Sequence, residues 1–300
     1  MTSPNSTSSV SGIWFALATV FFFSINTSIA KIFVSYIQPV MLAGLLFLGA
    51  GLGLLLFYLM AKGVRKPDAG LQKSDLGWFM AATISGGVLA PILLMIGLTQ
   101  VTASTASLLL NFESVFTAIL AWTVFREPWH WRVLLGIVII TAGGAVLSGA
   151  DPSRIGLSLG TLAVLGTCLL WALDGNLTRK IAIRDSLQVA MLRNLMAGLI
   201  DITIALSIGQ SFPPPIVILQ VFGAGLLCYG LAIWCFTLSL RYLGAAKTGA
   251  YLSLVPFAGA AFATLLLQEP VTESLLAAAV LMAIGAGFCL SDLSGQTGKP

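Results

Sequence analysis

Apolar runs long enough to cross a membrane follow one another along almost the whole chain. A helix of about 20 residues spans a hydrocarbon core of about 30 Å. Only 9% of the residues are charged, too few to cover a folded chain with a polar shell. The sequence therefore predicts an all-α polytopic membrane protein with ten transmembrane helices. They lie near 12–33, 39–61, 76–98, 103–125, 133–150, 157–178, 187–208, 216–240, 245–267 and 273–291.

One stretch of the sequence occurs twice. Residues 103–128 align without a gap with residues 245–270, and both copies begin with small residues, continue apolar and end in Glu-Pro. Two unrelated membrane helices of similar appearance are the alternative explanation. The repeat predicts two halves, residues 1–151 with helices 1 to 5 and residues 152–300 with helices 6 to 10.

The distribution of Lys and Arg predicts the orientation. Twelve of the fifteen lie on one predicted side of the membrane and two on the other, with Arg193 inside predicted helix 7. Because short cytoplasmic loops carry the excess of positive charge, we expect both termini in the cytoplasm. This bias also accounts for a pI near 9.0 without a nucleic-acid partner. The loops leave no room for a soluble domain.

An odd number of helices in each half turns the second half upside down. The loop 62–75 carries four basic residues, whereas its counterpart, 209–215, carries none. Inverted repeats are typical of secondary transporters, with the substrate site near the midplane between the halves. Some channels share this organisation, so a channel stays an alternative.

The two Glu-Pro pairs are expected to cap helices 5 and 10. Proline suits the first turn of a helix, and a carboxylate before it lies at the positive end of the helix dipole. Glu127 and Glu269 are therefore predicted to be N-terminal caps, with a role in transport as the alternative.

The Glu-Pro regions resemble a known family. The tail LLLQEPVTESLLAAAVLMAIGAGFCL and its echo VFREPWHWRVLLGIVIITAGGAVL are similar to the closing helices of EamA-type repeats in the drug/metabolite transporter (DMT) superfamily. In overall appearance the chain most resembles the YddG-type exporters of aromatic amino acids. The first repeat departs from the pattern, with Trp129-His130-Trp131 where the second has Val-Thr-Glu.

This resemblance implies a fold and a function. Helices 5 and 10 should stand outside a basket formed by the other eight. The chain should export small amphipathic metabolites, foremost aromatic amino acids, by alternating access, with drugs or other metabolites as alternative substrates. We expect it in the cytoplasmic membrane of a prokaryote. The sequence leaves the oligomeric state open, a monomer included.

Polar residues inside predicted helices are candidate site residues, because each needs a partner or a water-filled cavity. Glu113, in the middle of helix 4, is either a hydrogen-bonded neutral carboxyl between helices or a substrate or proton site. Asn111 corresponds to Ser253 in the second repeat, so both halves are polar there. Glu113 and Asn111 lie on different faces of helix 4 and are not expected to face one cavity.

Helices 1, 6 and 7 carry the other polar candidates. Asp174 is expected to bind substrate or to neutralise basic residues that follow it, and Asn26 is a candidate lining residue of helix 1. Lys31 and Arg193 are expected to extend toward the membrane surface. Arg193 and Asp201 lie about 12 Å apart along helix 7, too far to pair.

Two tryptophans lie away from the predicted helix ends. Trp171 on helix 6 and Trp234 on helix 8 are candidate walls for a flat aromatic substrate, with ordinary helix packing as the alternative. Small residues, among them Gly49 and Gly53 of a G-x-x-x-G motif, are expected to pack helices closely.

Enzyme chemistry finds little support. The sequence lacks a phosphate-binding G-x-x-x-x-G-K-[ST] motif. The G-x-S-x-G match at 156–160 needs a base near Ser158, but His130, the single histidine, lies on the opposite predicted side of the membrane. We therefore expect no enzyme, no cofactor and no metal site, with an intramembrane hydrolase as the remaining alternative.

Loop accessibility tests the inverted topology. In a variant without native cysteines, single cysteines introduced at 64–72 should react with an impermeant maleimide only from the cytoplasm. Cysteines at 210–213 should react only from outside, because the two loops are predicted on opposite sides. Labelling of both loops from the same side would contradict the inverted repeat.

Overall fold

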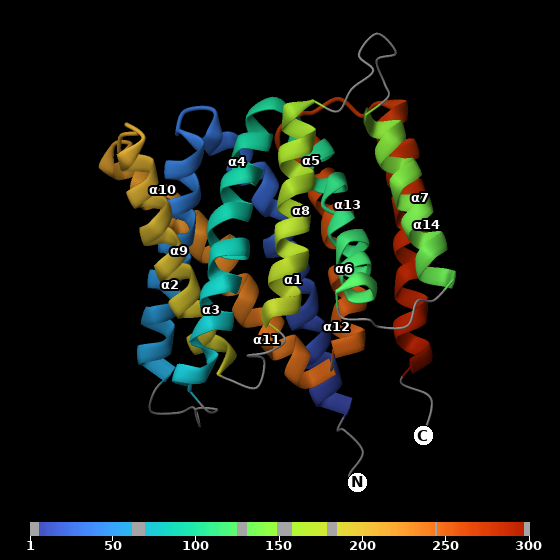
Figure 1. Ribbon diagram of the computed structural model, residues 1–300, viewed down its shortest axis with the longest axis horizontal. Helices are drawn as coiled ribbons and strands as arrows, with labels where there is room; N and C mark the ends of the chain where they lie inside the picture. The colour runs from blue at the N-terminus through green and yellow to red at the C-terminus, as the bar shows by residue number, and fades with distance from the viewer. Residues whose placement is uncertain are drawn as a thin grey trace.

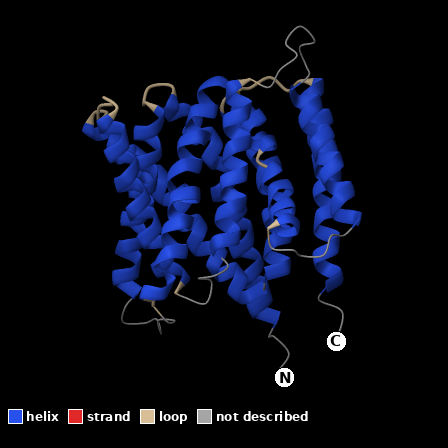
Figure 2. Cartoon of the chain, viewed as in Figure 1, coloured by secondary structure: helices blue, strands red, loops and turns tan. Residues whose placement is uncertain are grey.

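The computed structural model describes residues 6–61, 70–124, 131–148, 158–178, 185–243 and 245–296. Within these ranges every regular element is a helix (Figure 2). Eight helical segments of the described chain are long and apolar enough to cross a membrane, and two shorter apolar helices accompany them at Trp131–Leu147 and Glu273–Cys289. The prediction of an all-α protein with several membrane-spanning helices is confirmed.

In chain order the elements are α1 (Ser6–Val34), α2 (Pro39–Ala61), η1 (Lys73–Asp75), α3 (Leu76–Ala82), η2 (Thr83–Leu89), α4 (Ala90–Gln100), α5 (Ala103–Leu109), α6 (Phe112–Thr123), α7 (Trp131–Ser148), α8 (Leu159–Thr178), α9 (Ser186–Ser207), α10 (Pro215–Gly225), η4 (Leu226–Leu231), α11 (Ala232–Leu243), α12 (Ala245–Leu252), α13 (Val255–Leu266) and α14 (Glu273–Gln296).

Four of the predicted continuous helices are interrupted. In predicted helix 3, η2 is a π-helix between α3 and α4. Ala90 N–H donates to the Ser85 carbonyl, so it does not bind the Gly86 carbonyl as it would in a regular α-helix. Pro91 in the first turn of α4 has no N–H to offer either. The Gly86 carbonyl is therefore available to another donor.

Predicted helix 4 breaks into α5 and α6 at Leu110 and Asn111. Glu113 N–H donates to the Leu110 carbonyl at 3.1 Å, which tightens the turn and releases the Leu109 carbonyl. Predicted helix 9 breaks into α12 and α13 at Ser253 and Leu254, just before Pro256 in the first turn of α13.

The interruptions recur at corresponding places. The shift that carries 103–128 onto 245–270 also carries η2 to within one residue of η4, the second π-helix. It carries the break between α5 and α6 to within one residue of the break between α12 and α13. Discontinuous helices at matching positions are typical of transporters built from repeats. The division at residues 151 and 152 stays a prediction.

Helices α7 and α14 stand apart from the rest. Figure 1 shows them side by side at one edge, and each packs mainly on the other. Glycines bring them close: a Cβ on Gly143 would lie 2.8 Å from Met282 Cγ, and one on Gly136 would lie 2.5 Å from Cys289 Sγ. Helices 5 and 10 thus lie outside the main bundle, as the resemblance implied.

The largest buried apolar cluster surrounds α2. A Cβ on Gly49 would lie 2.5 Å from Phe222 Cα on α10, and a Cβ on Gly53 would lie still closer to Leu226 of η4. Both contacts confirm the close packing expected of the G-x-x-x-G motif. On its other side α2 packs on α9, its most extensive neighbour. There a Cβ on Gly198 would lie 2.5 Å from the Leu48 amide nitrogen.

The close contact between α2 and α9 can be tested at Gly198. Gly198→Ala should lower stability by about 1–3 kcal/mol, because the added methyl group forces two backbones apart. The measurement is the thermal melting of the purified protein in detergent. Gly77→Ala on α3 is the control, because nothing lies within 4 Å of a Cβ at Gly77. Equal melting temperatures for the two variants would contradict the packing.

Candidate functional site

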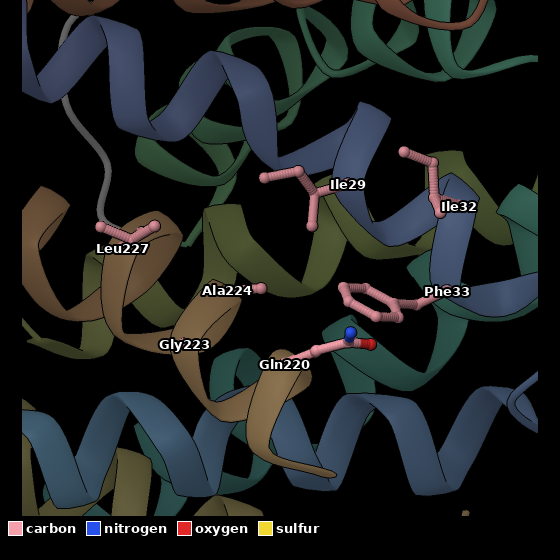
Figure 3. Close-up of a pocket in the computed structure, with 7 residues that line it drawn as sticks. All are labelled: Ile29, Ile32, Phe33, Gln220, Gly223, Ala224 and Leu227. Carbon is pink, nitrogen blue, oxygen red and sulfur yellow. The ribbon is translucent and has the colours of Figure 1, made fainter. Parts of the chain in front are cut away.

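A cleft of about 430 Å³ lies between α1 and α10. Its lining is apolar except for one amide side chain (Figure 3) and comprises Ile29, Ile32, Phe33, Gln220, Gly223, Ala224 and Leu227. Helix α1 packs closely on α11 but has few contacts with α10. The two helical segments therefore diverge along α1, toward the end of the bundle where α1 ends. We call this the far end.

A hydrogen bond lies next to the inner part of the cleft. Asn26 precedes Ile29 by about one turn on the same face of α1. Its Nδ2 donates to the Tyr229 hydroxyl of η4 at 2.9 Å, and both residues are buried. Among the described residues Asn26 Oδ1 has no hydrogen-bond partner. An apolar cleft with one polar pair beside its base suits an amphipathic solute.

A charged cluster lies near the end of α8, and Figure 1 shows that α8 ends on the side of the bundle where α1 begins and α14 ends. We call this the terminal end. Arg193 Nη2 of α9 donates to Asp174 Oδ2 of α8 at 2.7 Å and to the Ala82 carbonyl of α3 at 3.3 Å. Thr178 accepts from Arg193 Nη1 at 3.3 Å and donates to Asp174 Oδ1 at 3.0 Å. The Arg193 guanidinium thus links α9 to α8 and to α3.

This ion pair corrects two sequence predictions. Arg193 does not extend to the membrane surface, and the ion pair of Asp174 is with Arg193 on the next helix. Residues 179–184, whose basic side chains Asp174 was expected to neutralise, lie outside the described residues. Because α8 and α9 are consecutive and antiparallel, two charges placed before and after their connection lie at similar depth. The position of Asp174 shortly before this connection, and of Arg193 shortly after it, was the sequence pattern that could have predicted the pair.

Trp171 lies one turn before Asp174 and contacts the π-helix η2. Its Nε1 donates to the Gly86 carbonyl at 3.2 Å, the carbonyl that the π-helix leaves without Ala90 as a donor. Gly86 has no side chain, and a Cβ there would collide with the Asp174 carboxyl group. Glycine at this position therefore allows α8 to approach η2.

Glu113 and Asn111 face different neighbours, as expected. Glu113, in the first turn of α6, lies within electrostatic range of Asp174 on α8. Asn111 is buried, and its Nδ2 donates to the Leu108 carbonyl at 2.9 Å and lies 3.9 Å from Met282 Sδ on α14. Glu113 is therefore influenced by the charge of Asp174 on α8, whereas Asn111 lies between α5 and α14.

The structure does not bring the remaining candidates to the cluster. Trp234 packs between Phe15 and Phe57, with ring centroids 6.4 Å and 4.6 Å away. Ser253 lies at the break before α13, where its hydroxyl donates to the Ala250 carbonyl at 2.8 Å. Roles for both in binding stay predictions. Sequence reasoning did not identify Tyr229 or Phe33, because nothing local distinguishes them from packing residues.

Comparison with known proteins identifies the family. The sequence profile of the EamA-like transporter family matches residues 10–149 and again 158–291. The chain belongs to the EamA-like transporter family. Members of this family are transporters, so a membrane transport function is supported, whereas export of aromatic amino acids is not shown by the match.

Two curated relatives agree with the family. The chain is 27% identical over 271 residues to an "uncharacterized transporter" of Methanothermobacter thermautotrophicus, covering 85% of this chain and 78% of the relative. It is 26% identical over 290 residues to the uncharacterized transporter YvbV of Bacillus subtilis, covering 93% and 91%. An archaeal and a bacterial relative fit a prokaryotic membrane.

A solved structure supports the fold. A protein crystal structure with 18% sequence identity superposes with a TM-score of 0.66 over 99% of this chain and 100% of that chain. At this identity the similarity concerns the fold alone.

In this EamA-like chain the carboxylate of Glu269, in the second Glu-Pro pair, caps α5 and not α14, the helix that it was predicted to cap. Glu269 accepts from the backbone N–H groups of Ala103 at 2.7 Å and Ser104 at 2.8 Å, at the start of α5. Helix α14 begins only at Glu273, and Thr272 accepts from Leu275 N–H at 3.1 Å instead. Glu269 thus joins the segment before α14 to the start of α5. Glu127 lies outside the described residues.

Two other charged residues have distinct surroundings. Lys31 does not extend outward as expected: its Nζ donates to the carbonyls of Leu98 and Val101 at 2.5 and 2.8 Å, at the end of α4, within electrostatic range of Glu269. Asp201 on α9 is fully buried, and neither carboxyl oxygen has a hydrogen-bond partner in the described chain. No group of three potential metal ligands occurs among the described residues.

Removing the Glu269 carboxylate tests which helix it caps. Glu269→Ala should destabilise the protein by about 0.5–2 kcal/mol, because two N–H groups of α5 lose their acceptor. Glu273→Ala, in the first turn of α14, should have a smaller effect. Thermal melting in detergent compares the two. A larger loss from Glu273→Ala would contradict the assignment of Glu269 to α5.

Proposed function

We propose that the chain is a secondary transporter that exports small amphipathic metabolites, with aromatic amino acids as the preferred substrates. It works by alternating access between two inverted five-helix halves, residues 1–151 and 152–300. It lies in the cytoplasmic membrane with both termini, and so the terminal end of the bundle, in the cytoplasm. Ten helices cross the bilayer.

The cleft between α1 and α10 is the observation that carries this proposal. Its volume of about 430 Å³ falls within the range of small-molecule sites, about 300–1,000 Å³. Apolar walls suit the apolar part of an amphipathic solute, and the pair of Asn26 and Tyr229 lies close to its polar part. Phe33 offers an aromatic face, which adds about 0.5–1.5 kcal/mol for an aromatic substrate.

A difference between the two ends of the bundle supports alternating access. In the repeat α8 corresponds to α1, and α3, η2 and α4 correspond to α10, η4 and α11. At the terminal end α8 contacts α3 and η2, and the charged cluster joins them. At the far end α1 and α10 diverge. Exchange of these two arrangements between the halves would expose the site to the other side of the membrane.

An exporter of apolar drugs is the second candidate, and a channel is the third. The apolar lining of the cleft favours the drug exporter, because it would accept a solute without charged groups. Proteoliposome counterflow separates the candidates. Saturable counterflow of tryptophan supports the amino acid exporter, whereas counterflow confined to uncharged aromatic compounds supports the drug exporter. Flux proportional to concentration at all concentrations would indicate a channel.

Filling the cleft should stop transport without unfolding the protein. Gly223 lines the cleft, and nothing lies within 4 Å of a Cβ there, so Gly223→Leu places a side chain in open space. We expect tryptophan counterflow to fall by about tenfold or more, because overlap with the substrate costs binding energy. Gly287→Leu is the control, because Gly287 has the same free space but lies on α14, outside the main bundle. Normal counterflow in Gly223→Leu at normal yield would place the substrate elsewhere.

A further inference from the structure

Burying the ion pair between Asp174 and Arg193 costs free energy that a purely structural contact between helices would not need. Both side chains lie in membrane-spanning helices, and transferring two charges out of water costs more than the pair usually returns. Both α8 and α9 pack on η2, and apolar side chains of similar volume would fill this region at least as well. Charged residues at such depth usually serve transport or binding. The pair therefore calls for a functional explanation.

The pair also helps to hold the terminal end of the bundle closed. Arg193 binds the Ala82 carbonyl in addition to Asp174, and Trp171 binds the Gly86 carbonyl. These bonds hold α8 and α9 to α3 and η2. Separating the helices at the terminal end would leave an unpaired carboxylate and an unpaired guanidinium. The closed end therefore opens readily only when other groups replace both partners.

We propose that Asp174 and Arg193 recognise the charged head of a zwitterionic α-amino acid, and that the substrate opens the terminal end by replacing each partner of the pair. This inference rests on the proposed function and assigns the residues that recognise the substrate when it enters at the terminal end, before it reaches the cleft at the far end. The substrate carboxylate binds Arg193, and the substrate ammonium group binds Asp174. The exchange leaves the net charge of the site unchanged.

The surroundings of the pair fit both groups. A planar guanidinium binds a carboxylate with two parallel hydrogen bonds. Asp174 supplies the carboxylate for the substrate ammonium group, and Glu113 lies within electrostatic range of Asp174. The side chains of Arg193 and Asp174 are 19% and 16% exposed, so both keep part of their surface free while the terminal end is closed. Trp171, one turn from Asp174, lies beside the position of an aromatic side chain.

The proposal makes transport depend on both charges of the substrate. Tryptamine lacks the carboxylate and would leave Arg193 unpaired, whereas indole-3-propionate lacks the ammonium group and would leave Asp174 unpaired. Leaving one member of a buried charge pair alone is strongly unfavourable. We expect the wild-type protein to transport tryptophan with a kcat/KM at least about tenfold above that of either analogue.

Two neutralising variants test the assignment of each group. Arg193→Gln should reduce the preference for tryptophan over tryptamine, because the carboxylate no longer has a cationic partner. Asp174→Asn should reduce the preference for tryptophan over indole-3-propionate. The measurement is proteoliposome uptake of the three compounds at equal protein density. Asp201→Asn removes another acid from α9 and should keep the wild-type selectivity. If a neutralised variant fails to fold, Arg193→Lys and Asp174→Glu keep the charges with altered geometry and should raise the KM for tryptophan.

The outcomes separate this inference from the proposed function. Saturable transport of tryptophan with selectivity that shifts as described supports both. Equal transport of the three compounds by the wild-type protein, or equal losses for all three in both neutralised variants, overturns the recognition by Asp174 and Arg193 alone. The same holds if the charge-keeping variants retain the wild-type KM. Absence of saturable amino acid transport by the wild-type protein overturns the proposed function, and this inference with it.

Discussion

Backbone carbonyls released by the helix interruptions need other donors inside the membrane, and the packing of the bundle depends on the side chains that supply them. Without water, an unsatisfied carbonyl in the hydrocarbon region costs several kcal/mol. Trp171 supplies the donor for Gly86 in η2, and Cys168 Sγ lies 3.4 Å from the Leu109 carbonyl at the break after α5. Lys31 binds the last carbonyls of α4. Each of these bonds joins two helices, so the donor for each carbonyl comes from a neighbouring helix.

The same interruptions place the polar residues of the candidate site. Glu113 and Asn111 lie at the break between α5 and α6, and Tyr229 lies within η4. The π-helix η2 presents Gly86 to Trp171 and, because glycine has no side chain, lets Asp174 approach. In a regular α-helix most carbonyls already accept a bond within the helix, so a carbonyl released at an interruption depends more on a donor from a neighbour. The interrupted helices therefore need side-chain donors for their free carbonyls, and these donors lie next to the interruptions.

The chemistry of the two ends differs in a way that suits a transporter. The far end carries an apolar cleft, whose walls can close on each other without leaving a polar group unpaired. The terminal end is closed by an ion pair and hydrogen bonds, which resist opening unless another polar group replaces them. Membership of the EamA-like family supports transport in general. In the mechanism that we propose, this difference between the ends gives that function a physical basis, and Asp174 and Arg193 hold the terminal end.

The sequence by itself determined the helical membrane fold and the family, because apolar runs and a Glu-Pro repeat are local patterns. It also marked Asp174, Glu113 and Trp171 as polar or aromatic residues at costly depth. Only the tertiary structure decided their partners: Arg193 pairs with Asp174, Glu269 caps α5 instead of α14, and Trp234 packs among phenylalanines. The reason is physical. Hydropathy reports the cost of burying a group, whereas the partner that offsets the cost comes from another helix, and its identity depends on how interrupted helices pack.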